Sequence, residues 1–330
     1  MKTIRITRTG GPEVLDYTEL PTPVPGPTQV LVRAHAIGVN MPEVLVRKGT
    51  YSWMPPLPAI PGIEMSGTIV AVGNEVTSLR TGQKVYVSAR ELAVRAGCYA
   101  EYIAVDASVP YVLPEGADLD AAATLANYQV AWHLLYSATR GFTYDSVLIT
   151  AAGGGIGSAA VQLARAAGKR VIATVRSAEK AAFALSQGAD AAINTRDADA
   201  NARIAAATKG FGVDLLLDPV GGTGFAALFD HLAPLGLAVL YGSLDGWPGS
   251  ELTAKIRERQ GDSLGMRMFS MHTFDHDRAA RARATDALID LLARGAIRPA
   301  IHDRIPLAEV ARAHTLLESG KVFGKLVLKP

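Results

Sequence analysis

Hydrophobic and polar positions alternate in short runs over the first third of the chain, and this alternation predicts β-strands. The strands are expected at residues 29–36, 65–72, 84–87 and 100–105. Glycine and proline residues separate these runs at short spacing, and a proline-rich connector at 21–27 precedes the first of them. Short strands punctuated in this way are typical of a small β-barrel or sandwich.

Near residue 120 the pattern changes to a regular alternation of strands and helices. A long helical stretch is expected at 121–136, and strands are expected at 146–150, 170–175, 191–194, 213–218 and 238–241. The intervening helices include 179–187 and 224–232, and helices at 278–293 and 307–319 precede a last strand at 325–328. This alternation predicts a doubly wound parallel sheet, so the expected fold class is α/β with a separate β-rich part.

The most informative motif is a glycine-rich turn between the strand at 146–150 and the helix that follows it. Its residues are Ala152, Gly153, Gly154, Gly155, Ile156 and Gly157. Glycines let the backbone approach a dinucleotide pyrophosphate, and the helix N-terminus offers unpaired N–H groups and the positive end of a dipole. The usual fingerprint, G-x-G-x-x-G, has a glycine where this chain has Ala152, and an ordinary tight turn is the alternative. The strand–turn–helix context, with another strand after the helix, favours a dinucleotide site.

The residues after the second strand of this unit indicate which dinucleotide is bound. An NAD site usually places Asp or Glu there, about 20 residues past the glycines, to bind the ribose hydroxyls. This chain has Arg176 and Ser177 instead, with Lys180 one turn into the next helix. The two cations can neutralise a 2′-phosphate and Ser177 can donate a hydrogen bond to it, so the motif favours NADPH. A solvated helix start with Ser177 as its N-cap is the compatible alternative.

Composition and charge narrow the remaining functions. The chain has 330 residues, which suggests two domains, and 49% of them are hydrophobic, which is ample for burial. The formal net charge is +2 and no basic run is interleaved with aromatic residues, so no nucleic-acid partner is expected. The longest uncharged stretch, 146–164, contains the glycine turn and is interpreted as a buried strand and helix, not as a membrane span.

The N-terminus and the cysteine content indicate the compartment. Residues 1–7 alternate like a strand and do not resemble a signal peptide. Cys98 is the only cysteine, so no internal disulfide can form. Both features fit a reducing cytoplasm, which is the expected location.

Several short motifs, spread nearly from end to end, are similar to those of one known family. Besides the glycine turn they are residues 38–40 (GVN), 47–51 (RKGTY), 61–67 (PGIEMSG), 97–102 (GCYAEY), 218–222 (DPVGG) and 313–320 (AHTLLESG). In this combination the chain resembles the zinc-independent medium-chain dehydrogenases/reductases of the quinone oxidoreductase (zeta-crystallin-like) group. The resemblance implies a GroES-like catalytic domain at 1–123, a Rossmann NADPH-binding domain at 124–270 and a C-terminal segment at 271–330 that completes the catalytic domain. It also implies a homodimer, with NADPH bound in the interdomain cleft.

Departures from the zinc-dependent relatives argue against a metal. Those relatives place cysteine where this chain has Asn40 and histidine where it has Ile63. They also often carry a four-cysteine structural loop, which a chain with a single cysteine cannot form. A tetrahedral zinc site needs three or four thiolate or imidazole ligands brought together, and the histidines here show no such spacing. No metal site is therefore expected.

Without a metal, the chemistry that the resemblance implies is direct hydride transfer from NADPH. The acceptor must have an electron-poor carbon conjugated to an oxygen that can take the charge, so quinones and α,β-unsaturated carbonyl compounds qualify. The protein must position this acceptor and stabilise the resulting oxyanion, and a positioned acid can supply a proton.

By family likeness, Asn40 and Tyr51 are the catalytic candidates. Asn40 would lie near the nicotinamide, and Tyr51 would direct its hydroxyl at the substrate. A turn cap is the alternative role for Asn40, and an aromatic lid packed on apolar neighbours is the alternative for Tyr51. Further cofactor contacts are implied by position alone: Tyr241, Ser243 and Phe269 at the nicotinamide, and Gly221 where the backbone passes the cofactor.

The expected function is therefore an NADPH-dependent reductase of quinones or α,β-unsaturated carbonyls. An enoyl-thioester reductase is the alternative among enzymes. An NADPH-binding protein with little turnover is the alternative from another class, because some zeta-crystallin-like relatives serve structural roles.

Overall fold

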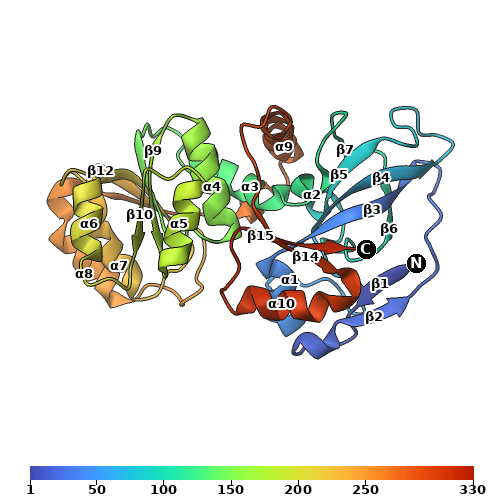
Figure 1. The fold of residues 1–330 in the computed structure, drawn as a ribbon, viewed down its shortest axis with the longest axis horizontal. Coiled ribbons are helices and arrows are strands. Elements are labelled where there is room, and N and C mark those ends of the chain that lie inside the picture. Colours follow the sequence, from blue (N-terminus) through green and yellow to red (C-terminus); the bar gives the residue numbers. More distant parts are fainter. The chain divides into compact units, whose positions relative to one another are not determined.

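The computed structural model describes residues 1–330 and divides the chain into two compact units (Figure 1). Unit 1 comprises Met1–Ala126 and Arg278–Pro330, and unit 2 comprises Asn127–Asp277. Both ends of the chain therefore belong to one unit, and the other unit is inserted between them. The boundaries expected at 123 and 270 lie a few residues before these divisions.

A seven-stranded sheet forms the centre of unit 1. Six of its strands follow the order β14-β15-β3-β4-β5-β7, and β6 pairs with β3. The bounds are β3 (Gln29–Val39), β4 (Glu64–Val72), β5 (Lys84–Ser88), β6 (Tyr102–Asp106), β7 (Tyr111–Val112), β14 (Ile301–Pro306) and β15 (Lys325–Lys329), and β1 (Lys2–Arg5) pairs separately with β2 (Asp16–Glu19). In Figure 1 the red strand β15 lies beside the blue strand β3, and their register places Leu326 opposite Val39. The β-rich part expected from the alternating pattern is thus confirmed, and the C-terminal segment completes its sheet.

Unit 1 has four helices, of which only α9, with 16 residues, is longer than nine residues. They are α1 (Met41–Lys48), α2 (Leu119–Ala122), α9 (Arg278–Ala293) and α10 (Val310–Glu318), with 3-10 turns η1 (Pro12–Val14), η2 (Ala89–Glu91) and η7 (Leu307–Glu309). The ends of α1 follow from its sequence. Glu43 lies in its first turn and Arg47 in its last, which suits the helix dipole, and Gly49 ends it with φ +75°. This helix matters because it follows Asn40 directly and leads into the segment that carries Tyr51.

Unit 2 is built on a six-stranded sheet in the order β10-β9-β8-β11-β12-β13. Its strands are β8 (Ser146–Ile149), β9 (Arg170–Val175), β10 (Ala191–Asn194), β11 (Val213–Asp218), β12 (Leu232–Leu240) and β13 (Gly265–Met268), and all neighbours are parallel. The first strand of the chain in this sheet, β8, lies inside it, and later strands are added outward on both sides. This is the doubly wound Rossmann arrangement, so the predicted fold class is confirmed.

The helices of unit 2 connect these strands. They are α4 (Gly155–Ala166), α5 (Ala178–Ser186), α6 (Ala200–Ala207), α7 (Gly224–Leu228) and α8 (Ser250–Glu258), with turns η4 (Phe229–His231), η5 (Gln260–Asp262) and η6 (Met271–Phe274). The first boundary between the units falls within α3 (Leu125–Trp132), which continues into a π-helical turn, η3 (His133–Ser137).

The prediction of one continuous helix at 121–136 is wrong. The structure has helical turns over most of this stretch but divides them into α2, α3 and η3, with a break between α2 and α3. Two polar groups of the sequence explain the first break. The Thr124 hydroxyl donates to the carbonyl of Ala121 at 2.7 Å, and the N–H of Ala126 donates to Glu64 Oε2, also at 2.7 Å. A backbone donor that would serve a continuous helix is therefore bound to a distant carboxylate instead, which periodicity alone does not reveal.

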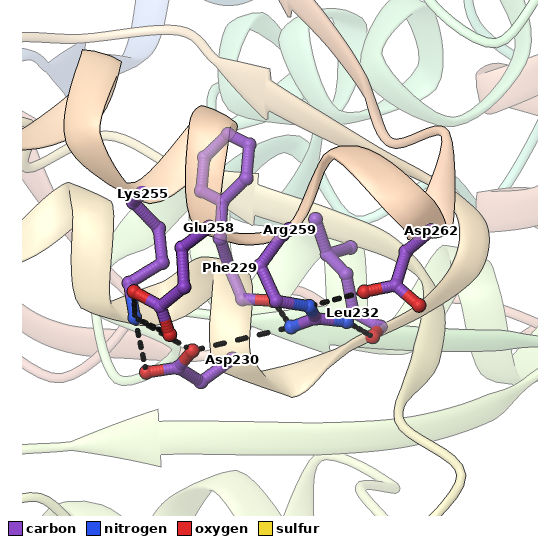
Figure 2. Close-up of polar contacts among 7 residues, drawn as sticks. All are labelled: Phe229, Asp230, Leu232, Lys255, Glu258, Arg259 and Asp262. Carbon is purple, nitrogen blue, oxygen red and sulfur yellow. Dashed lines mark hydrogen bonds and ion pairs between the residues drawn. The ribbon is translucent and has the colours of Figure 1, made fainter.

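The segment leading into the edge strand β13 is fixed by charged side chains (Figure 2). Arg259 donates to the carbonyls of Phe229 at 2.6 Å and Leu232 at 3.0 Å, the first residues of η4 and β12. Lys255 on α8 pairs with Asp230 at 2.9 Å. These contacts tie α8 and η5 to the body of the sheet just before β13 starts.

No helix of the protein combines the length and the hydrophobicity that a membrane span requires.

Candidate functional site

The glycine turn has the geometry that a pyrophosphate site needs. Helix α4 begins at Gly155, and its N-cap, Gly154, offers no side chain to occupy the free N–H groups. A Cβ atom at Gly157 would lie 2.6 Å from the carbonyl oxygen of Ala151, so only glycine allows α4 to approach the turn this closely. Ala152 is fully buried in the place where the usual fingerprint has its first glycine. The turn therefore accommodates an alanine there and still presents an open helix N-terminus.

The structure brings Lys180 and the glycine turn together. A Cβ atom at Gly153 would lie 3.0 Å from Lys180 Cδ, so the lysine stem lies across the turn. Burial, and then repulsion from Arg176, lowers the pKa of the Lys180 ammonium below its ordinary value. An anionic group placed between these two cations would relieve that repulsion, which is the environment expected of a 2′-phosphate site.

Ser177 has the role that its helix position predicts. Its Oγ accepts the N–H of Lys180 at 3.2 Å and caps α5. A hydrogen bond with Ser177 also lowers the pKa of Glu179 in the first turn of the helix. The capping interpretation therefore holds, and β9 ends with no carboxylate before Arg176.

The remaining candidates of unit 2 lie at the same edge of the sheet. The carboxyl ends of the parallel strands carry Tyr241 and Ser243 after β12, Phe269 after β13, and Gly221 after β11. Gly221 is buried with φ +68°, and its N–H donates to Asp218 Oδ1 at 2.7 Å. The N–H of Phe269 donates to the carbonyl of Leu240 at 2.9 Å, which extends the pairing of β12 and β13 by one residue. Carboxyl ends of parallel strands are where open α/β sheets bind their ligands.

In unit 1 the structure surrounds Asn40 with charged side chains that sequence reasoning missed. Lys325 Nζ donates to Asn40 Oδ1 and, at 2.7 Å, to Glu64 Oε1. Asn40 Nδ2 faces Glu64 Oε1 at 3.1 Å and Glu43 Oε1 at 3.3 Å. All four residues are buried, with exposed fractions between 0% and 6%. We call Asn40, Glu43, Glu64 and Lys325 the Asn40 cluster.

This network fixes the orientation of the Asn40 amide. An ammonium can only donate and a carboxylate can only accept, so the oxygen must face Lys325 and the nitrogen must face the glutamates. Asn40 is the N-cap residue of α1, but its side chain makes no hydrogen bond to the backbone of the helix. The alternative role as a turn cap is therefore wrong for the side chain. Every polar atom of this amide already has a partner inside the protein.

The Asn40 cluster holds two carboxyl groups and one ammonium. Burial raises the pKa of Glu43 to about 7, and the nearby Lys325 only partly offsets this. Glu43 Oε2 is buried with no hydrogen-bond partner, so no donor stabilises a negative charge on this oxygen. Gly38 makes room for the cluster, because a Cβ atom there would lie 2.7 Å from Glu64 Cδ. The signal in the sequence was Lys325, a charged residue directly before the apolar run 326–328 of the terminal strand.

Tyr51 lies half-buried after α1, in unit 1. Its ring centroid is 5.6 Å from that of Trp53 at an interplanar angle of 57°, and it packs against the hydrophobic core of the unit. Arg47, four residues earlier, donates to Glu318 Oε2 on α10 at 2.7 Å. This ion pair brings the motif at 47–51 to the motif at 313–320, so segments from both ends of the chain hold the Tyr51 segment.

The structure contains neither a cluster of metal ligands nor a reactive thiol. No group of three or more His, Cys, Asp or Glu side chains is arranged to hold a metal ion. Ile63 contributes its N–H to Glu43 Oε1 at 3.2 Å. Cys98 is fully buried, and burial raises the pKa of its thiol well above the ordinary value, so it is not a reactive thiolate.

Both units match known protein families. The model of the alcohol dehydrogenase GroES-like domain matches residues 26–115, and the zinc-binding dehydrogenase model matches residues 155–276. The quinone oxidoreductase of Pseudomonas aeruginosa is 34% identical over 330 residues, which cover 100% of this chain and 99% of that protein. The Escherichia coli quinone oxidoreductase, solved in complex with NADPH, has a TM-score of 0.86 at 29% identity and covers 100% of both chains. A solved NAD-dependent alcohol dehydrogenase has a TM-score of 0.88 at 30% identity, again over 100% of both chains.

A GroES-like unit combined with a Rossmann sheet defines the medium-chain dehydrogenases/reductases. Within that class, the relatives of 30% identity or more that this chain matches over its full length include quinone oxidoreductases. The chain belongs to the quinone oxidoreductase family, as the motifs at 38–67, 97–102, 218–222 and 313–320 predict.

Proposed function

We propose that this protein is an NADPH-dependent reductase of quinones or α,β-unsaturated carbonyls that works by metal-free hydride transfer. The observation that carries the proposal is the arrangement of Lys180 across the glycine turn, with Arg176 beside it and no carboxylate at the end of β9. The complex of the Escherichia coli relative with NADPH supports the choice of cofactor.

The residues of unit 2 fit this cofactor. The N-terminus of α4 would bind the pyrophosphate, and Arg176 and Lys180 would bind the 2′-phosphate. When bound, NADPH supplies the hydride. Tyr241, Ser243 and Phe269, at the carboxyl edge of the sheet, remain our candidates for orienting the nicotinamide end.

Unit 1 contributes the candidates for proton delivery and substrate positioning. The Tyr51 hydroxyl is proposed to donate the proton that the α-carbon of an enone must gain. Asn40 is proposed to act through its fixed orientation, because its amide is held by Lys325 and two glutamates.

The test is the loss of NADPH absorbance with a panel of quinones, enones and crotonyl thioesters. We expect turnover with quinones or enones and a higher kcat/KM for NADPH than for NADH. Turnover confined to the thioesters would favour an enoyl-thioester reductase. Tight NADPH binding with no turnover on any acceptor would favour a binding protein, and absence of NADPH binding would contradict the whole proposal.

We further propose that the protein is a homodimer. β13 is the last strand of the sheet order, so its outer edge has no strand partner within the chain. Met266 and Met268 on this strand are 36% and 58% exposed, and the contacts of Figure 2 hold the preceding segment in place. An open strand edge is a template for pairing with a second copy. A cytoplasmic location is proposed from the single cysteine, which is buried and without a disulfide partner.

A further inference from the structure

Three loops meet at the carboxyl edge of the unit 2 sheet, where we propose that the cofactor binds. They follow β8, β11 and β12, three strands that are adjacent and parallel. The loop after β8 is the glycine turn, which begins at Thr150. The loop after β11 contains Gly221 and Gly222, and the loop after β12 contains Tyr241 and Ser243.

One buried carboxylate connects the first two loops. Asp218, the last residue of β11, is 2% exposed, and its Oδ2 accepts the Thr150 hydroxyl at 2.5 Å. Its Oδ1 accepts the N–H groups of Val220 at 2.9 Å and Gly221 at 2.7 Å. Burial raises the pKa of this carboxyl, and the hydrogen bonds partly offset that effect. Asp218 therefore holds the turn of its own loop and the start of the glycine turn with the two oxygens of a single side chain.

The loop after β11 is in turn bound to the loop after β12. The N–H of Asp245 donates to the carbonyl of Val220 at 2.8 Å, and the N–H of Gly222 donates to the carbonyl of Gly246, also at 2.8 Å. A Cβ atom at Gly222 would lie 2.6 Å from the carbonyl oxygen of Asp245, and φ is +60°. The close approach of two loops, and not only passage of a cofactor, thus requires a glycine here.

The same contacts define what Asp218 cannot do. Its carboxylate faces three donors of the protein, and the N–H groups of Val220 and Gly221 are already occupied by it. Gly221 therefore has no N–H available for a phosphate oxygen. The 219–222 loop therefore contributes to the site through its backbone shape, which Asp218 fixes, and not through these two N–H groups.

We propose that Asp218 is a positioning residue that joins the glycine turn, the 219–222 loop and the 241–246 loop into one preformed cofactor edge. This inference rests on the proposed binding of NADPH. It assigns Thr150 as the direct partner through which the glycine turn is held. A preformed site avoids the free-energy cost of ordering its loops on binding. Removing the Thr150–Asp218 hydrogen bond should therefore lower the affinity for NADPH, although neither residue need contact the cofactor.

The test uses two substitutions at Thr150 that differ by one hydroxyl. Thr150→Val keeps the branched shape and removes the donor, whereas Thr150→Ser keeps the donor. NADPH dissociation constants are measured by isothermal titration at a temperature where all variants are folded. We expect Thr150→Val to weaken NADPH binding about tenfold, as for loss of one hydrogen bond to a charged group, and Thr150→Ser to bind within about twofold of wild type. At saturating NADPH the kcat of Thr150→Val should stay close to wild type while KM for NADPH rises.

A matched control removes a buried threonine hydroxyl elsewhere in the same unit. Thr139 is 5% exposed and donates to the carbonyl of Leu135 at 2.6 Å, so Thr139→Val loses a buried hydrogen bond, to a neutral acceptor, that touches none of the three loops. It should lose stability and keep its NADPH affinity. If Thr150→Val does not fold, Asp218→Asn keeps an oxygen for the two N–H groups, removes the charge, and is expected to weaken NADPH binding by a similar factor.

The outcomes separate this inference from the proposed function. A Thr150→Val protein that binds NADPH as tightly as wild type overturns the inference, and so does a Thr150→Ser protein that is as weak as Thr150→Val. Wild-type protein that fails to bind NADPH contradicts the proposed function instead.

Discussion

At the scale of one residue, substitution of Arg176 tests how the protein selects NADPH over NADH. It is exposed beside Lys180, which already lies across the glycine turn. A charge-assisted phosphate contact contributes about 1.5–3 kcal/mol, or roughly tenfold to a hundredfold in affinity. Arg176→Ala should therefore weaken NADPH binding by that factor and leave NADH almost unchanged, as measured by titration of both cofactors. Arg257→Ala, at an exposed site on α8, is the control and should change neither. Equal losses for the two cofactors would mean that Arg176 supports the fold.

Substitutions at Tyr51 distinguish two roles of this residue, proton donation to the substrate and packing against Trp53. Enone reduction leaves an enolate whose α-carbon must gain a proton, and a positioned acid contributes about 10²–10⁴-fold to such a step. A hydroquinone anion is stable enough to be protonated in water. Tyr51→Phe keeps the ring that packs with Trp53, so enone turnover should fall about 100-fold while quinone turnover falls much less.

The two activities are compared at saturating NADPH, with Tyr51→Ala as the packing control. If Tyr51 is only a lid, Tyr51→Phe retains both activities and Tyr51→Ala loses both. That result would leave solvent or a ribose hydroxyl as the proton source.

At the scale of elements, the Asn40 cluster joins the starts of β4 and β15 to the first turn of α1. The pKa of Glu43 is raised to about 7 in the folded protein, so folding retains a proton that the unfolded chain releases above about 4.5. The stability from this proton is complete below about pH 4.5 and is lost as the pH rises through about 7. Glu43→Gln keeps the shape and removes the titration.

Denaturant unfolding at pH 5 and pH 8 measures this effect. Relative to Glu43→Gln, wild type should lose about 2–3 kcal/mol of stability between these pH values. Lys325 and Glu64 remain in both proteins, so their charges cancel in the difference. An unchanged difference between wild type and variant would show that Glu43 is ionised throughout.

The same elements predict the metal content. Asn40 Oδ1 accepts a hydrogen bond from the Lys325 ammonium, and Ile63 offers only its backbone N–H. No group of three or more metal-binding side chains is present. Elemental analysis of the purified protein should therefore find far less than one zinc per chain. Stoichiometric zinc would require a site built from other residues.

At the scale of the whole molecule, the open edge of β13 predicts a dimer. Light scattering should give twice the chain mass of 34.7 kDa. Met268→Lys places a charge on that edge and should shift the protein toward monomer. Phe211→Lys is the control, because Phe211 is 78% exposed and lies outside β13. A wild-type monomer, or a Met268→Lys dimer of unchanged stability, would contradict this assembly.

Local patterns in the sequence predicted most of the architecture. Alternating runs predicted the strands of unit 1, and the alternation of strands and helices predicted the Rossmann sheet. The glycine turn between β8 and α4 predicted where a dinucleotide would bind. These features depend on neighbours within a few residues, such as Gly157 against Ala151 or Ser177 capping α5. Contacts of this kind join residues that are close in the sequence, so the local residue pattern is enough to predict them.

Contacts between distant residues were decided only by the tertiary structure. The expected helix at 121–136 breaks because the N–H of Ala126 binds Glu64, which lies far away in the sequence. Lys325 reaches Asn40 across almost the whole chain, and Asp218 reaches Thr150 from another strand. A buried charge needs a partner, but the sequence does not say which one, because the partner is chosen by which strands become neighbours in the sheet.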